Sequence, residues 1–242
     1  MEALTRLRSD PRVTVRRSGD PNFAGSCVVY WMQRSQRAFD NPALNVAVEA
    51  ANILDKPAVI FFAPVPYYPH ANLRHYRFLN QGIPDIAHDA GKRNIGFVLR
   101  RFPDHSLLKF CEEVNPALVV GDENPVREPR SWREKAAERL RVPLWTVDAD
   151  VVVPTKLLEK EQYASHIIRP RIQARLAEFL KPLKNPKAQI SWKRPHDVTS
   201  LADDAEIDRD WKLDRSVQPV TGFCGGTNEG RRRLEVDRKS VV

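Results

Sequence analysis

Short apolar runs alternate with longer helical patterns through the middle of the chain, and this alternation constrains the fold more than any other feature. The apolar runs lie at residues 27–32, 58–62, 95–99, 117–120 and 143–147, with helical patterns between them at 42–54, 70–91, 105–114 and 130–140. Nearly continuous apolar runs of this length are typical of strands that are buried on both faces of a sheet. The order predicts an α/β fold, namely a doubly wound, mostly parallel sheet of five strands.

The first apolar run ends in a polar, doubly basic turn, which contains Gln33, Arg34, Ser35, Gln36 and Arg37. Asp40 or Asn41 is a suitable N-cap for the helix that follows, and Pro42 suits its first turn. Doubly wound sheets bind their ligands at the carboxyl edge, where strands lead into the N-termini of helices. The sequence therefore predicts a ligand site at this edge.

Residues from two parts of the chain are expected to meet at this ligand site, because the topology brings the ends of their strands together. They are Trp31, Arg34 and Arg37, from the first strand and its turn, and Asp122 and Asn124, which follow the fourth strand. No residue is assigned a catalytic role.

Aromatic and acidic residues near the strand ends have two interpretations each. Tyr30, Trp31, Tyr67 and Tyr68 suit a slot for a planar chromophore, but aromatic packing in the core explains them equally well. The acids that follow the fourth strand admit acid–base chemistry. Ion pairing with Arg127, Arg130 and Arg133 is the favoured interpretation of these acids.

Several common sites are disfavoured by patterns that the sequence lacks. The first strand-to-helix turn has neither Gly-x-Gly-x-x-Gly nor Gly-Lys-Ser/Thr, which disfavours ordinary dinucleotide and P-loop binding. The six histidines show no metal-ligand spacing, so no metal site is expected. Cys27, Cys111 and Cys224 form no Cys-x-x-Cys pattern, which favours a reducing, cytoplasmic setting.

The chain is basic, with a formal net charge of +8 and a pI near 9.6. This charge favours a polyanionic partner, nucleic acid ahead of a membrane surface, although a merely basic soluble protein fits equally well. Residues 1–26 hold several arginines but no apolar segment of the secretory kind, so they are expected to form a flexible basic arm. No membrane partner is expected, and the chain is expected to be a monomer.

The alternation ends after residue 147, so the α/β domain is expected to span residues 27–154. Helical patterns near 156–166 and 170–180 predict a helical extension over residues 155–180. Residues 181–222 begin with a Pro-, Lys- and Asn-rich stretch and are expected to form an interdomain linker over the surface. The isolated apolar residues after residue 197 are too few to bury a core of their own.

Five segments and a later motif carry a resemblance. The segments are 29–37 (Val-Tyr-Trp-Met-Gln-Arg-Ser-Gln-Arg), 72–79 (Asn-Leu-Arg-His-Tyr-Arg-Phe-Leu), 121–125 (Gly-Asp-Glu-Asn-Pro), 147–154 (Val-Asp-Ala-Asp-Val-Val-Val-Pro) and 163–170 (Tyr-Ala-Ser-His-Ile-Ile-Arg-Pro). The motif is Phe223-Cys224-Gly225-Gly226 with Arg232, Arg233 and Leu234. In this order they resemble class II DNA photolyases, which repair cyclobutane pyrimidine dimers with light. Ser35, where an acid is common, and Gly230, where alanine is usual, depart from the family pattern.

The resemblance implies a Rossmann-like N-terminal domain that can hold a light-harvesting antenna, either a deazaflavin or a folate. It also implies a helical domain that binds FAD, receives the flipped-out dimer of damaged DNA, and lies beyond the equivalent of Leu234. Residues 223–236 would begin this domain in truncated form, so the chain alone is expected to bind no FAD and to repair no dimers. Residues 237–242 break the resemblance and are expected to be a non-native tail on a gene fragment.

Two alternatives remain open at this point. A light sensor of the cryptochrome kind resembles photolyases in its α/β half. A stand-alone nucleotide-binding or nucleic-acid-binding module would use the basic excess directly, and its DNA binding would depend on salt.

Overall fold

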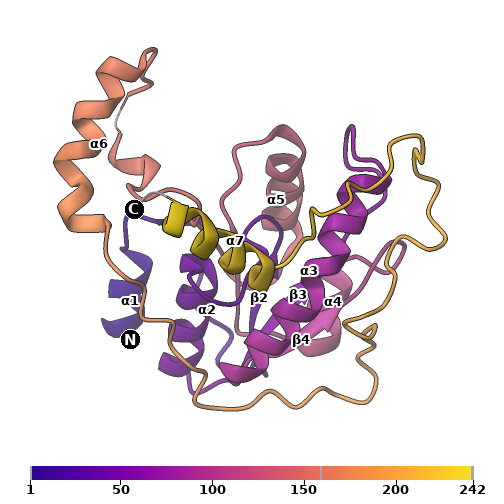
Figure 1. The fold of residues 1–242 in the computed structure, drawn as a ribbon. Helices are drawn as coiled ribbons and strands as arrows, with labels where there is room; N and C mark the ends of the chain where they lie inside the picture. The colour runs from indigo at the N-terminus through magenta and orange to yellow at the C-terminus, as the bar shows by residue number, and fades with distance from the viewer. Residues whose placement is uncertain (1, 159, 241–242) are drawn as a thin grey trace.

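The computed structural model describes residues 2–158 and 160–240, and within them six strands form one sheet (Figure 1). The strand order is β1 (Val13–Arg17), β6 (Leu144–Val147), β5 (Leu118–Asp122), β2 (Val28–Met32), β3 (Ala58–Phe62) and β4 (Gly96–Leu99). All neighbouring strands are parallel except β1 and β6, which pair antiparallel. The predicted α/β fold with a mostly parallel sheet is confirmed.

The sheet has six strands and not five, because the N-terminal segment contributes β1. The expectation of a flexible arm is wrong for this segment: α1 (Glu2–Arg8) buries Leu4, and Val13 is paired with Val147. The Arg12 guanidinium donates hydrogen bonds to the carbonyl oxygens of Asp148 (3.0 Å) and Val151 (2.7 Å). An edge strand needs a partner on one side only, so a short, half-polar strand is sufficient here.

Helices cover both faces of the sheet. The helices α1, α2 (Pro42–Ile53) and α3 (Leu73–Lys92) pack on one face, and α4 (Leu107–Val114) and α5 (Arg127–Arg139) pack on the other. As predicted, Asn41 caps α2, because its side-chain oxygen accepts a hydrogen bond from the Leu44 amide (3.0 Å). The four helices α2 to α5 therefore lie close to the predicted positions.

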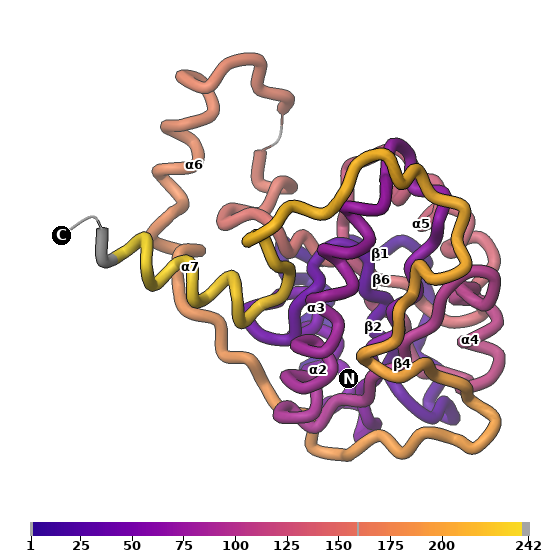
Figure 2. Tube along the Cα trace, turned by 45° about the vertical axis from the view of Figure 1, so that its right-hand side comes forward, coloured from indigo at the N-terminus to yellow at the C-terminus, as the bar shows by residue number. Residues whose placement is uncertain are grey.

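The extension after β6 differs from the prediction of two helices. It contains a short 3-10 turn, η1 (Thr155–Leu157), and one helix, α6 (Ser165–Phe179). Pro170 lies inside α6, where it removes the single hydrogen bond to the carbonyl of His166 without ending the helix. Figures 1 and 2 show that α6 projects from the body of the molecule, and none of its residues is buried.

Residues 180–226 contain no helix or strand and form a strap that runs over the surface past α4, β4 and α3 (Figure 2). The strap is not loose, because Ala188, Val198, Ile207 and Trp211 are buried against the α/β domain. The isolated apolar residues of this part of the chain therefore extend an existing core. The Pro-, Lys- and Asn-rich composition predicted that this part of the chain runs over the surface, as it does.

The last helix, α7 (Thr227–Ser240), begins where the strap meets α3. The Gly225 amide donates to the side chain of Gln81 (2.8 Å), and the Asn228 amide donates to Asp85 (2.9 Å). A Cβ atom at Gly225 would lie 1.9 Å from the carbonyl oxygen of Phe78, so only glycine allows this close approach. The non-native origin of residues 237–242 stays a prediction.

The cysteines Cys27, Cys111 and Cys224 are all free. No helix in the described part of the chain has the length and apolar character that crossing a membrane requires.

Candidate functional site

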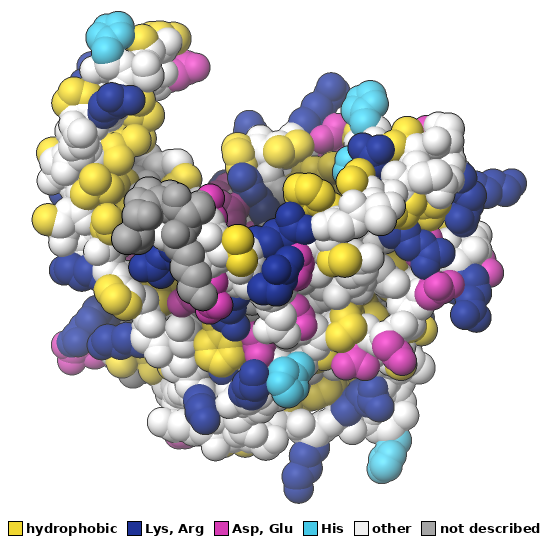
Figure 3. Space-filling view, in the orientation of Figure 1, with side chains coloured by type: hydrophobic (Ala, Val, Ile, Leu, Met, Phe, Trp, Pro, Cys, Tyr) yellow, Lys and Arg dark blue, Asp and Glu magenta, His cyan; other side chains and the backbone are white. Residues whose placement is uncertain are grey.

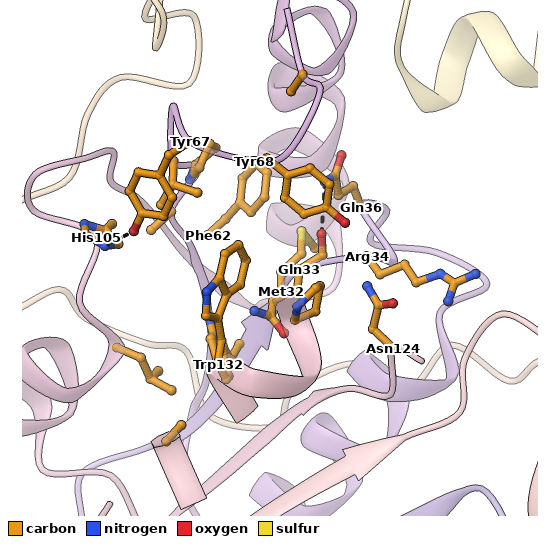
Figure 4. A pocket seen from close by; sticks show the side chains of 18 of the residues that line it. Met32, Gln33, Arg34, Gln36, Phe62, Tyr67, Tyr68, His105, Asn124 and Trp132 are labelled. Carbon is orange, nitrogen blue, oxygen red and sulfur yellow. Dashed lines mark hydrogen bonds between the residues drawn. The ribbon is translucent and has the colours of Figure 1, made fainter. Parts of the chain in front are cut away.

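A cavity of about 700 Å³ opens at the carboxyl ends of β2 and β3, the sheet edge at which the sequence predicted a ligand site (Figure 4). Its lining comes from the turn after β2, the loop after β3, the loop before α4, and one side each of α3 and α5. Several elements that are distant in the sequence thus build one hollow. This volume lies within the range of small-molecule and cofactor sites.

Three of the five predicted site residues lie in the cavity lining, and two do not. Trp31, Arg34 and Asn124 are lining residues, whereas Arg37 and Asp122 are not. The Arg37 guanidinium turns away and donates to the carbonyl oxygens of Asp40 (3.0 Å) and Ala149 (3.4 Å). Ligand binding by the three lining residues stays a prediction.

Aromatic side chains form much of the cavity wall. Tyr68 and Trp132 meet edge to face with their ring centres 6.1 Å apart, and Tyr67 meets Phe102 in the same way at 5.8 Å. Tyr67 and Tyr68 are 52% and 37% exposed, so their rings remain accessible at the opening. Figure 4 shows Tyr67, Tyr68, Phe62 and Trp132 around one space. A planar, conjugated molecule would stack well on such surfaces.

One polar atom in the lining lacks a partner. The side-chain oxygen Oε1 of Gln33 is buried and accepts no hydrogen bond from the described residues. A buried acceptor without a donor costs about 1–3 kcal/mol. A ligand that carries an N–H or O–H group would remove this cost, so Gln33 is the side chain that most directly indicates a ligand.

Asp122 has the opposite character, since its carboxylate is buried and fully engaged. One oxygen accepts from the Tyr30 hydroxyl (2.7 Å), and the other accepts from the backbone amides of Gln33 (2.9 Å), Arg34 (2.7 Å) and Ser35 (3.0 Å). Burial raises the pKa of Asp122, although these four donors oppose the rise. Burial and the nearby Asp122 raise the pKa of Tyr30, so its hydroxyl keeps its proton and donates. Asp122 therefore holds the turn that forms the cavity floor.

The turn is also tied to the segment after β6. The Arg34 guanidinium forms an ion pair with Asp150, and the Ser35 hydroxyl donates to the same carboxylate (3.0 Å). Asp150 thus supplies a carboxylate to Ser35 from the segment after β6. The position of Arg34 at the cavity is fixed by this pair.

Of the ion pairs predicted for these acids, with Arg127, Arg130 and Arg133, the described residues contain only the one between Arg133 and Glu123. Its carboxylate accepts from Arg133 (2.9 Å) and Arg16 (2.6 Å), whereas Arg130 pairs with Glu134. Burial opposes ionisation of Glu123, but hydrogen bonds from Arg16 and Thr146 and the charge of Arg133 outweigh it and lower the pKa. Neither Glu123 nor Asp122 lies in the cavity lining, so the structure gives no support to acid–base chemistry by these two acids there.

A tyrosine–histidine pair stands at the cavity opening. The Tyr67 hydroxyl lies 2.8 Å from Nε2 of His105, and Nδ1 of His105 lies 3.0 Å from the carbonyl oxygen of Pro103. The carbonyl can only accept, so Nδ1 carries the proton and Nε2 accepts from Tyr67. His105 and Trp132 were not predicted as site residues, because nothing in their local sequence places them beside β2.

Within the described residues, no group of three or more His, Cys, Asp or Glu side chains is arranged to bind a metal.

Comparison with known proteins identifies the family. The model of the DNA photolyase family matches residues 28–187. The deoxyribodipyrimidine photo-lyase of Methanothermobacter thermautotrophicus is 34% identical over 214 residues, which cover 86% of this chain and 46% of that relative. Those of Potorous tridactylus and Arabidopsis thaliana are 30% and 29% identical, over 86% and 79% of this chain and 39% and 38% of the relatives. The chain thus spans less than half the length of these relatives, and it belongs to the DNA photolyase family.

Proposed function

We propose that this chain forms the N-terminal, antenna-type domain of a class II photolyase and that its cavity binds a planar chromophore, either a deazaflavin or a folate. The observation that carries the proposal is the combination of aromatic walls with the unpartnered oxygen of Gln33. A bound antenna would absorb light and pass the excitation energy to a flavin elsewhere in the whole protein.

The lining suits such a molecule in three ways. The rings of Tyr68 and Trp132 offer apolar faces for stacking. The Gln33 oxygen can accept a hydrogen bond from a ring N–H group. Lys135 and Arg139 on α5 lie in the lining and would attract an anionic tail such as the glutamate of a folate.

For the whole protein we propose the activity named in its relatives, deoxyribodipyrimidine photo-lyase, with damaged DNA as substrate and reduced FAD as the electron donor. Membership of the family and the names of the relatives support this proposal. The residues of this chain would contribute by binding and orienting the antenna and by keeping water from its ring.

Equilibrium titration of the 242-residue chain tests the antenna proposal. A deazaflavin and a folate are each titrated while ligand fluorescence is followed, and one of them is expected to bind with a 1:1 stoichiometry. Tyr68→Ala is expected to weaken that binding about tenfold, which corresponds to about 1.4 kcal/mol of lost stacking. Tyr163→Ala is the matched control, because Tyr163 is 86% exposed and does not line the cavity.

Two results would contradict the antenna proposal. One is that neither chromophore binds at concentrations up to about 1 mM, where even weak ligands of folded sites are detected. The other is that Tyr68→Ala and Tyr163→Ala change the affinity equally, which would place the ligand outside the cavity.

A further inference from the structure

The positive charge of this protein is concentrated in one part of the chain. Residues 165–196, named here the basic segment, comprise α6 and the start of the strap. They carry eight Lys and Arg residues against one acid, Glu178, a net charge of +7 in a chain whose total is +8. The eight cations are Arg169, Arg171, Arg175, Lys181, Lys184, Lys187, Lys193 and Arg194. The rest of the chain is therefore almost neutral.

The cations of the basic segment are exposed and have few partners. All eight are solvent-exposed, and among the described residues only Arg175 forms an ion pair, with Glu178 at 3.3 Å. By contrast, arginines of the α/β domain such as Arg77, Arg100 and Arg133 are paired with carboxylates. The cations of this segment thus differ from these paired arginines in that few of them have a carboxylate partner. Figure 3 shows basic side chains among apolar ones on the projecting arm.

The backbone at residues 185–188, next to Lys184 and including Lys187, is fixed to the domain. The buried Arg93 side chain donates to the carbonyl of Pro186 (3.0 Å), and the Arg93 carbonyl accepts from the amide of Ala188 (2.9 Å). Asn52 donates to the carbonyl of Lys187 (3.0 Å), and Asn185 accepts from the amide of Asp40 (2.7 Å). Lys187 therefore extends from this fixed stretch and Lys184 lies directly before it, which lowers the entropic cost of binding a partner.

We infer that the basic segment is a binding surface for the phosphate backbone of duplex DNA. Its strap lysines recur every third residue, about 9 Å apart in an extended chain, so each can reach a different phosphate, because the phosphates of one strand recur about every 3.4 Å along the axis. The inference rests on charge and exposure alone and does not depend on the cavity.

A membrane surface is the less suitable anionic partner. A helix that lies on a membrane inserts an exposed apolar face into the lipid. In α6 the apolar residues at helical spacing, Ile168, Ile172, Leu176 and Phe179, are partly covered, and the Arg12 guanidinium lies 5.7 Å from the ring centre of Phe179. The exposed apolar side chains beside the strap lysines, Leu180 and Leu183, are isolated and form no continuous apolar face. Contact with phosphates through side-chain charges alone is typical of nucleic-acid binding.

The test compares two triple variants of the 242-residue chain on an undamaged DNA duplex. The first, Lys181→Gln with Lys184→Gln and Lys187→Gln, removes the strap lysines. The second, Arg8→Gln with Arg127→Gln and Arg141→Gln, removes the same charge from exposed sites in other parts of the chain. Affinity is measured by fluorescence anisotropy over a series of salt concentrations, and circular dichroism checks that both variants are folded.

The strap variant is expected to bind at least tenfold more weakly than the unaltered chain at about 100 mM salt, with the slope of log K against log salt reduced by roughly 2–3. The control variant is expected to keep the slope within about one unit of the unaltered chain. Equal losses in the two variants would overturn the inference, since net charge and not this surface would then carry the binding. Salt-dependent binding to phosphatidylserine vesicles without binding to the duplex would overturn it as well.

Discussion

Asp122 and Gln33 meet at the same edge of the sheet, yet their polar groups are in opposite conditions. The backbone N–H of Gln33 donates a hydrogen bond to the Asp122 carboxylate at 2.9 Å, so the two residues are direct neighbours. The Asp122 carboxylate receives four hydrogen bonds, whereas the side-chain oxygen of Gln33 receives none. A buried group that is fully bonded supports the fold, whereas a buried acceptor without a donor in a cavity lining is able to accept a hydrogen bond from a ligand. This difference in hydrogen bonding distinguishes residues that shape the cavity, such as Asp122, from residues that would contact a ligand, such as Gln33.

Asp122→Asn is expected to have the largest effect on stability, because it disrupts the carboxylate that accepts four hydrogen bonds. The amide cannot accept from three backbone amides and the Tyr30 hydroxyl at once, since it replaces one acceptor oxygen by a donor. The free energy of unfolding should fall by about 2–4 kcal/mol. Urea denaturation followed by circular dichroism measures this change.

Asp20→Asn is the control for this substitution, because Asp20 is exposed, and its effect should stay within about 0.5 kcal/mol. A loss below about 1 kcal/mol for Asp122→Asn would show that the turn after β2 is held by other contacts.

Glu123→Gln, at the position next to Asp122, is expected to lower the free energy of unfolding by less than Asp122→Asn does. Its effect should depend on pH. The pKa of Glu123 is lowered in the folded state, so the stabilisation is fully present above the unfolded value of about 4.3 and is lost as the pH falls through the folded pKa. At pH 7 the variant should be less stable by about 1–2 kcal/mol, because Arg133 loses its ion pair.

The difference in the free energy of unfolding between the original chain and Glu123→Gln should therefore shrink as the pH falls below about 4.3. Denaturation series at several pH values measure it. A difference that stays constant between pH 7 and pH 3 would contradict the role assigned to the Glu123 charge.

The strands of the sheet core could be predicted because each is a continuous apolar run in the local sequence. β1 could not, since Val13 and Val15 alternate with polar residues beside Arg16 and Arg17, and the strand exists only through its pairing with β6. The same limit applies to α6, where Pro170 suggested a break that the helix does not have.

The location of the cavity could be predicted from topology, but the direction of individual side chains could not. Trp31 and Arg34 follow β2 directly and lie in the lining, whereas Arg37 turns toward Asp40 and Ala149. Trp132 reaches the cavity from α5, a helix whose sequence is mostly charged and gives no local sign of a site. The unpartnered state of Gln33 depends on all the surrounding elements, so only the folded structure reveals it.

Gln33→Leu is the measurement that tests the central claim most directly, because it removes the unpartnered oxygen while nearly preserving the side-chain volume. Chromophore affinity and the free energy of unfolding are measured on the same preparation. The affinity is expected to fall about tenfold, and the stability is expected to stay equal or to rise by up to about 1 kcal/mol, since a buried acceptor without a donor has been removed. An unchanged affinity together with a loss of more than about 2 kcal/mol in stability would contradict the account, because Gln33 would then support the fold and not the ligand.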